Sequence, residues 1–288
     1  MRVQSIIQHV AALACLATGP LDAQAVAGGS LVSADEMRAR GIVGLKSQSS
    51  GVRCGSCTGT LVAPDLVLTA RHCLDQGEDG PLKEVIFGST DLFRATEESQ
   101  QRRVVSVRAA PGPEADLALV KFDGSAPADY TIDRLVTSLG STIEGSEGVE
   151  EVFTFGFGQQ QEESLAGAGV LRSLTDSVIL DGVEKDAPLV TVLPADNAKG
   201  MCVGDSGGPA FVKAEDISGF SADAKTAQWQ SAHPKNAPFA QVGVLSTIGG
   251  PECEGGSSEY VSVAAYGRWL KEAAKELGSP LEREVAAR

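Results

Sequence analysis

A serine lies in the middle of the glycine-rich run Cys202–Pro209, which reads Cys-Val-Gly-Asp-Ser-Gly-Gly-Pro. Glycines on both sides allow backbone conformations that other residues avoid, and they let another chain approach closely. Such a turn can expose the hydroxyl of Ser206 while the neighbouring N–H groups point at a substrate oxygen. The run therefore favours a serine nucleophile, with a plain glycine-rich surface turn as the alternative.

A serine hydroxyl is a weak nucleophile at neutral pH, so it needs a base within hydrogen-bond reach. The chain has three histidines. His9 lies in the apolar N-terminal stretch, and His233 lies in a polar segment just before a proline. His72 follows the strand-like apolar run Leu66–Ala70, so it is the histidine that the fold would hold most firmly. We take His72 as the base.

The base in turn needs a partly buried acid that fixes its tautomer. Asp116 is the best candidate because it leads into the apolar run Leu117–Val120. A polar residue that merely begins a strand would give the same pattern. The candidate catalytic group is therefore Ser206, His72 and Asp116.

Short apolar runs that are rich in β-branched residues recur along the chain, bounded by Gly, Pro, Asp and Ser, and they predict antiparallel strands. The first set is Thr58–Ala63, Leu66–Ala70, Glu84–Phe87, Arg103–Val107 and Leu117–Lys121. The second set is Glu151–Phe155, Val170–Ile179, Leu189–Leu193, Pro209–Val212, Ala240–Ser246 and Tyr260–Val263. A polar stretch at residues 122–146 separates the two sets.

One strong helix is predicted over Ala264–Leu277, because Tyr266, Trp269 and Leu270 fall on one face. Residues 278–288 should form a flexible tail. The polar segment 213–236 is expected to be a surface insertion.

Four motifs in this order resemble the chymotrypsin/trypsin family of serine proteases: Cys57–Leu61, Leu68–Cys73, Asp116–Leu119 and Gly204–Pro209. The resemblance covers about residues 26–277 and suggests a secreted member of the bacterial type. It implies an all-β fold of two six-stranded antiparallel Greek-key β-barrels with a C-terminal α-helix. The barrels would cover about 26–140 and 141–263.

The run Gly204–Gly208 also matches the G-x-S-x-G motif of α/β-hydrolases. That fold needs its histidine after the serine, and only His233 follows Ser206. The chain shows no alternating βα pattern, so we set this interpretation aside.

The resemblance implies peptide-bond hydrolysis through an acyl-enzyme, with Ser206 as nucleophile, His72 as base and Asp116 as its orienting acid. It assigns the oxyanion hole to the N–H groups of Gly204 and Ser206, and it makes Ser246 a support for the buried Asp116. A catalytically inactive binding protein on the same fold is the alternative function, although all three triad residues are present.

By position in the family, Gly200 lies at the base of the specificity pocket, where trypsins carry aspartate. Ile248 replaces a small residue on the pocket wall, and Thr247 replaces an aromatic one. The strand Ser246–Ile248 should pair with the substrate main chain. We predict cleavage after small or medium uncharged residues rather than Arg or Lys. Further candidates near the pocket are Ser257, Ser258, Glu252 and Glu254.

The first 25 residues resemble a secretory signal, with Arg2, an apolar stretch and an A-x-A cleavage site at Ala23–Ala25. This predicts a secreted or periplasmic protein. A lipobox ending at Cys15 is the alternative and would make it a lipoprotein.

The chain after this cut begins Val26-Ala27-Gly28-Gly29, which resembles the mature N-terminus of the family. There the freed amino group pairs with the aspartate before the serine, here Asp205. Such pairing matters because a buried, unpaired carboxylate is costly. A competing activation site lies at Arg40–Gly44.

Six cysteines also suit an exported protein. The resemblance implies disulfides Cys57–Cys73 and Cys202–Cys253. Cys54 is left without a partner once the signal is removed, and its closeness to Cys57 leaves the partner of Cys73 open.

The formal net charge of −14 disfavours nucleic acid and anionic lipid as partners. No stretch is long and apolar enough for a stable membrane span, and the acidic loop at residues 75–84 lacks a calcium-binding pattern. We therefore expect no cofactor or metal. The resemblance implies a polypeptide substrate, and nothing in the sequence demands an oligomer, so we expect a monomer.

Overall fold

The structure is a computed structural model. It describes residues 26–47, 56–75, 77, 80–94, 100–112, 115–133, 135–138, 151–160, 167–181, 187–213, 239–249, 253–281 and 284–286. Several sequence predictions fall outside the described residues: the signal at residues 1–25, Cys15, Cys54, Glu252, His233 and all but the first residue of the segment 213–236.

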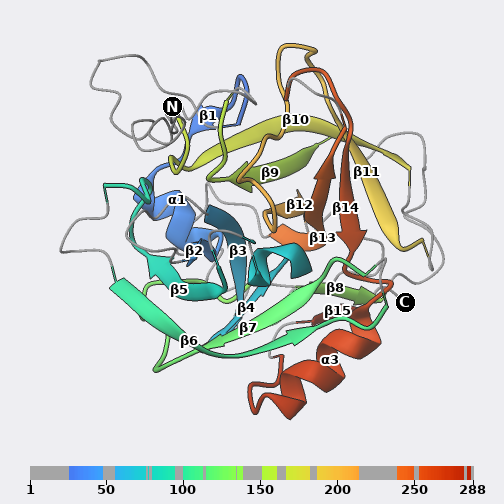
Figure 1. The fold of residues 1–288 in the computed structure, drawn as a ribbon. Coiled ribbons are helices and arrows are strands. Elements are labelled where there is room, and N and C mark those ends of the chain that lie inside the picture. The colour runs from blue at the N-terminus through green and yellow to red at the C-terminus, as the bar shows by residue number, and fades with distance from the viewer. Residues whose placement is uncertain are drawn as a thin grey trace, which may run out of the picture.

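Six antiparallel strands close a first barrel in the order β2-β3-β4-β7-β6-β5 (Figure 1). Their bounds are β2 Ile42–Ser47, β3 Ser56–Ala63, β4 Leu66–Thr69, β5 Leu82–Phe87, β6 Gln100–Ala109 and β7 Ala118–Phe122. Five of the six follow the apolar runs of the sequence. The sixth, β2, begins at Ile42, which is fully buried and pairs with Thr60.

Six further strands form a second antiparallel ring in the order β12-β9-β10-β11-β14-β13, and β13 pairs back with β12. Their bounds are β9 Val152–Gly156, β10 Arg172–Asp181, β11 Leu189–Pro194, β12 Pro209–Lys213, β13 Phe239–Ile248 and β14 Ser258–Ser262. All six correspond to predicted strands. The fold is therefore all-β with two barrels, as the sequence predicts.

Three short strands extend the second sheet in ways that the sequence does not predict. β1, Ser30–Leu31, pairs with β10. β8, Leu135–Ser138, pairs in parallel with β13, and β15, Glu284–Ala286, pairs in parallel with β8. The N-terminal segment and β8 thus belong with the second barrel rather than the first. The tail expected to be flexible contributes a strand.

The C-terminal helix α3 covers Gly267–Glu276, inside the predicted range. Its buried side packs Leu270 and Ala273 against the body, and Lys121 Nζ of β7 donates to the carbonyl of Leu277 at 2.6 Å. A second, short helix α1, Ala34–Ala39, is capped by Ser33. No helix among the described residues is long and apolar enough to cross a bilayer.

The two barrels meet along β3. Thr58 of β3 donates its N–H to the carbonyl of Ser206 at 2.9 Å, and its hydroxyl accepts from Phe157 N at 3.1 Å. One hydrophobic cluster also joins the barrels, since it contains Leu61 of the first and Phe155 of the second. The turn that carries Ser206 is thereby fixed against the first barrel.

Candidate active site

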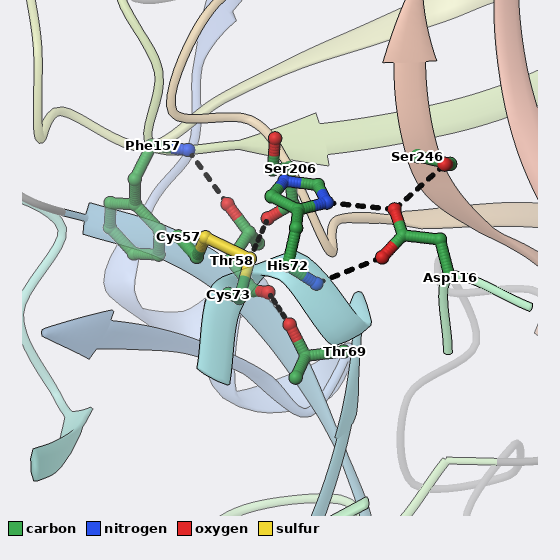
Figure 2. Close-up of a disulfide and its surroundings, with 9 residues drawn as sticks. All are labelled: Cys57, Thr58, Thr69, His72, Cys73, Asp116, Phe157, Ser206 and Ser246. Carbon is green, nitrogen blue, oxygen red and sulfur yellow. Dashed lines mark hydrogen bonds and ion pairs between the residues drawn. A yellow bond between two sulfur atoms is a disulfide. The ribbon is translucent and has the colours of Figure 1, made fainter. Parts of the chain in front are cut away.

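His72 and Asp116 lie at the adjoining ends of two paired strands. His72 is in the short 3₁₀ helix η1, Arg71–Leu74, which follows β4, and Asp116 precedes β7. His72 Nδ1 lies 2.7 Å from Asp116 Oδ2, and the His72 main-chain N–H donates to Asp116 Oδ1 at 2.9 Å (Figure 2). Because the carboxylate accepts a hydrogen bond from Nδ1–H, Nε2 is left as the proton acceptor.

Ser246 of β13 also holds this carboxylate, and its hydroxyl donates to Asp116 Oδ2 at 2.7 Å. Burial favours the neutral acid, but the hydrogen bonds from the His72 ring, the Ser246 hydroxyl and the His72 N–H outweigh it. Together they hold the pKa of Asp116 below its ordinary value. Asp116 is therefore ionised at neutral pH and can stabilise a protonated His72.

Ser206 lies beside the His72 ring, on the side away from Asp116 (Figure 2). The disulfide-bonded Cys73 brings the two together, because its sulfur lies 3.6 Å from the Ser206 carbonyl. Within the described residues the Ser206 hydroxyl makes no hydrogen bond to the ring. Such bonds are often long in unliganded enzymes and tighten when substrate binds.

The glycines around Ser206 are required by the backbone. Gly204 has φ +95° and Gly207 has φ +79°, in the region that favours glycine. A Cβ at Gly204 would lie 2.9 Å from the Cα of Gly158. In the part of the chain that the structure describes, the N–H groups of Gly204 and Ser206 donate to no other group. Both are free to bind an oxyanion.

The described residues contain two disulfides, with the pairings that the resemblance implies. Cys57–Cys73 ties β3 to η1, and Cys202–Cys253 ties the turn before Ser206 to the segment before β14. The sulfurs of Cys57 and Cys73 lie within 4.8 Å of a His72 ring nitrogen. Because they are joined as a disulfide, they offer no thiolate to a metal.

Asp205, next to Ser206, is a fully buried carboxylate. It accepts from Gly158 N and Cys202 N, each at 2.7 Å. Burial raises the pKa of Asp205 from 3.8 to about 7, although both hydrogen bonds act in the opposite direction. A side chain at Gly156 or Gly158 would overlap this carboxylate, so the Gly-Phe-Gly turn after β9 forms its cradle.

The N-terminal segment enters the second barrel beside the segment that leads to this aspartate. Val26 is fully buried in a hydrophobic cluster with Met201 and Tyr260. Burial and the charge of Asp205 both raise the pKa of the Tyr260 hydroxyl. Ala27 forms a bridge with Gly200, whose N–H donates to the Ala27 carbonyl at 3.1 Å. Residues 26–27 therefore lie against the segment that leads to Ser206.

Comparison with known proteins agrees with this geometry. Residues 26–270 match the family described as Trypsin. The chain belongs to the trypsin family. Among solved structures, human heparin binding protein matches with a TM-score of 0.64 and 19% identity, over 88% of this chain and 99% of that chain. At this identity the likeness shows the fold alone.

In this trypsin-family chain, main chain lies close to Gly200, the residue that the sequence analysis assigns to the base of the specificity pocket. A Cβ at Gly200 would overlap the carbonyl oxygen of Cys253, so position 200 has no room for a side chain. Ile248 is half-buried and pairs with the buried Ser258 of β14.

Sequence reasoning did not single out Met201, which follows Gly200, or Glu259 and Tyr260 of β14, which pair with β13. Met201 and Tyr260 are buried, whereas Glu259 is exposed and accepts from the Thr247 hydroxyl at 3.0 Å. The period-2 alternation of Ser258–Tyr260 is a signal that separates the inward residues from the outward one. It does not show what Glu259 would contact.

Proposed function

We propose that the protein is a serine endopeptidase that cleaves peptide bonds through an acyl-enzyme. The observation that carries the proposal is the position of His72, hydrogen-bonded to Asp116 on one side and adjacent to Ser206 on the other. The trypsin family implies peptide substrates, and the positions of His72, Asp116 and Ser206 support this chemistry.

In the proposed mechanism, Ser206 Oγ attacks the substrate carbonyl carbon and its proton passes to His72 Nε2. The carbonyl oxygen becomes an oxyanion and accepts from the N–H groups of Gly204 and Ser206. When the C–N bond breaks, the leaving amine takes the proton from His72. Water then attacks the ester carbonyl while His72 takes its proton. When the ester C–O bond breaks, His72 returns the proton to Ser206 Oγ and the acid product is released. Asp116 stabilises the protonated ring in both halves of the reaction.

We further propose that removal of the signal after Ala25 activates the enzyme, because the new ammonium of Val26 would pair with Asp205. The burial of both residues supports this. So does the backbone of Val26, whose φ of +52° is strained for a β-branched residue by about 1–3 kcal/mol. This torsion includes the bond to Ala25, so cleavage there removes the strain. Cleavage before Ile42 has no such support, since Ile42 starts a strand of the other barrel.

The proposed location is secreted or periplasmic, in agreement with the two disulfides, which are typical of oxidising compartments. The proposed specificity is for a small or medium uncharged residue before the cleaved bond. The lack of room for a side chain at Gly200 and the wall residue Ile248 support it.

The test is labelling with a fluorophosphonate probe on protein that begins at Val26, with mass spectrometry to locate the adduct. We expect an adduct on Ser206 that is absent in Ser206→Ala and lost in His72→Ala. Absence of any adduct on correctly processed, folded protein would favour the inactive binding protein instead. A peptide library cleaved chiefly after Arg would overturn the proposed specificity.

A further inference from the structure

A row of polar side chains crosses three strands beside the site. In the register of the second barrel, Thr191 of β11 lies opposite Glu259 of β14, and Glu259 lies opposite Thr247 of β13. Residues directly opposite in paired strands project from the same face. Glu259 and Thr247 are exposed, and the hydrogen bond between them holds the carboxylate over Thr247.

The strand β13 has an open edge at the end of this row. β12 pairs with β13 only as far as Val244, and Leu245 exchanges hydrogen bonds with Gly207 and Gly208. Beyond it, Ser246–Ile248 is bordered by β14 on one side, and none of the described strands pairs with it on the other. A substrate strand added at this edge would continue the row across a fourth strand.

The alternation of side chains along a strand determines which substrate residue faces the row of polar side chains. In the proposed substrate pose, the side chain of the residue before the cleaved bond faces the side of Ile248 and Ser258, which lie opposite each other in the register. Successive side chains of a strand point to opposite faces, so the second residue before the cleaved bond faces the side of Thr247. Opposite residues in adjacent strands have Cβ atoms about 4.5–5.5 Å apart. A long side chain there reaches the Glu259 carboxylate, because threonine does not cover it.

We propose that Glu259 selects substrates with lysine or arginine as the second residue before the cleaved bond. The proposal rests on the proposed peptidase function and names a specificity residue for it. The carboxylate is negative and exposed, and the hydrogen bond from Thr247 fixes its position before substrate arrives. A cation therefore pairs with it without first ordering the acidic side chain.

The test compares two peptides that share a small residue before the cleaved bond and differ by lysine or norleucine at the preceding position. Active protein beginning at Val26 is assayed for kcat/KM on both. We expect the lysine peptide to be preferred about 2- to 5-fold at low salt, in the range of exposed ion pairs, and less at high salt. Glu259→Gln should bring the ratio to about 1, chiefly by lowering kcat/KM on the lysine peptide.

Thr247→Val keeps the carboxylate but removes its hydrogen bond, so it should reduce the preference only in part. Glu272→Gln on α3, an exposed residue remote from β13, removes the same charge and should leave the preference intact. Equal rates for both peptides in the unaltered enzyme, or an undiminished preference in Glu259→Gln, would overturn the proposal.

Measurements of peptide binding test the role of Glu259 independently of the proposed peptidase activity. In Ser206→Ala protein the dissociation constants of the two peptides are measured directly, with and without Glu259→Gln. A lysine preference that depends on Glu259 supports the inference even if no hydrolysis is found. Hydrolysis or labelling of Ser206 without that preference refutes the inference alone. Binding of neither peptide refutes it as well.

Discussion

The charge of Asp205 makes the stability of the protein depend on whether residue 26 is the N-terminus. Where Val26 is preceded by another residue, no ammonium forms there and the buried carboxyl has a pKa of about 7 instead of 3.8. The folded state then holds a proton that the unfolded chain releases between these two values. The contribution of this proton to the free energy of unfolding is fully present below about pH 4, is lost as the pH rises, and is gone above about pH 7. At 1.36 kcal/mol per pKa unit, the loss is roughly 4 kcal/mol.

In protein that begins at Val26, the proposed pairing of the ammonium with Asp205 would hold the pKa of this carboxyl low, so this loss should not occur. The assay is thermal unfolding from pH 4 to pH 8 of two proteins in the Ser206→Ala background, one beginning at Ala25 and one at Val26. The difference between them should grow with pH to on the order of 10 °C in Tm.

Asp205→Asn in the protein beginning at Ala25 is the matched control, and it should remove the pH dependence between pH 4 and pH 7. Equal pH profiles for the proteins beginning at Ala25 and Val26 would refute the pairing. A slope that persists in Asp205→Asn would show that another group causes it.

Three substitutions test the rest of the site. Gly204→Ala should lower kcat about 100-fold or more by turning an oxyanion donor away, since φ +95° is strained for alanine, and steady-state kinetics with correct folding by circular dichroism checks this. Ser246→Ala should lower kcat about 10-fold, because Asp116 loses one charged hydrogen bond, and KM should change little. Gly200→Asp should lower Tm without creating cleavage after arginine, because its Cβ would overlap Cys253, and a peptide library with a melting curve tests both.

The strands could be predicted where their buried positions form a local run of apolar, β-branched residues. Runs such as Leu66–Thr69 are apolar and β-branched, and the structure places them within a residue or two of the prediction. β2 was not predicted as a strand, because Ile42-Val43-Gly44 is also the pattern of a mature N-terminus. β8 and β15 were missed because each is short and pairs with a segment distant in the sequence.

The candidate site also has a part that the sequence predicts and a part that it does not. The motif around Ser206 indicates the candidate reacting groups, because the chemistry requires particular residue types at particular positions of the motif. The lack of room for a side chain at Gly200 depends on the main chain of Cys253, and the location of Glu259 depends on the register of β13 against β14. Both are contacts between segments distant in the sequence that no local pattern encodes, so the sequence indicates the candidate reaction more closely than its substrate.

The reacting groups come from different barrels, so their alignment is a property of the interface. His72 and Asp116 belong to the first barrel, whereas Ser206 and Ser246 belong to the second. The hydrogen bonds from Thr58 N to Ser206 and from Ser246 to Asp116 cross between the barrels at the site itself. A small separation of the barrels would break both while leaving each core intact. Activity should therefore be lost through local opening at a lower denaturant concentration than the unfolding of either barrel.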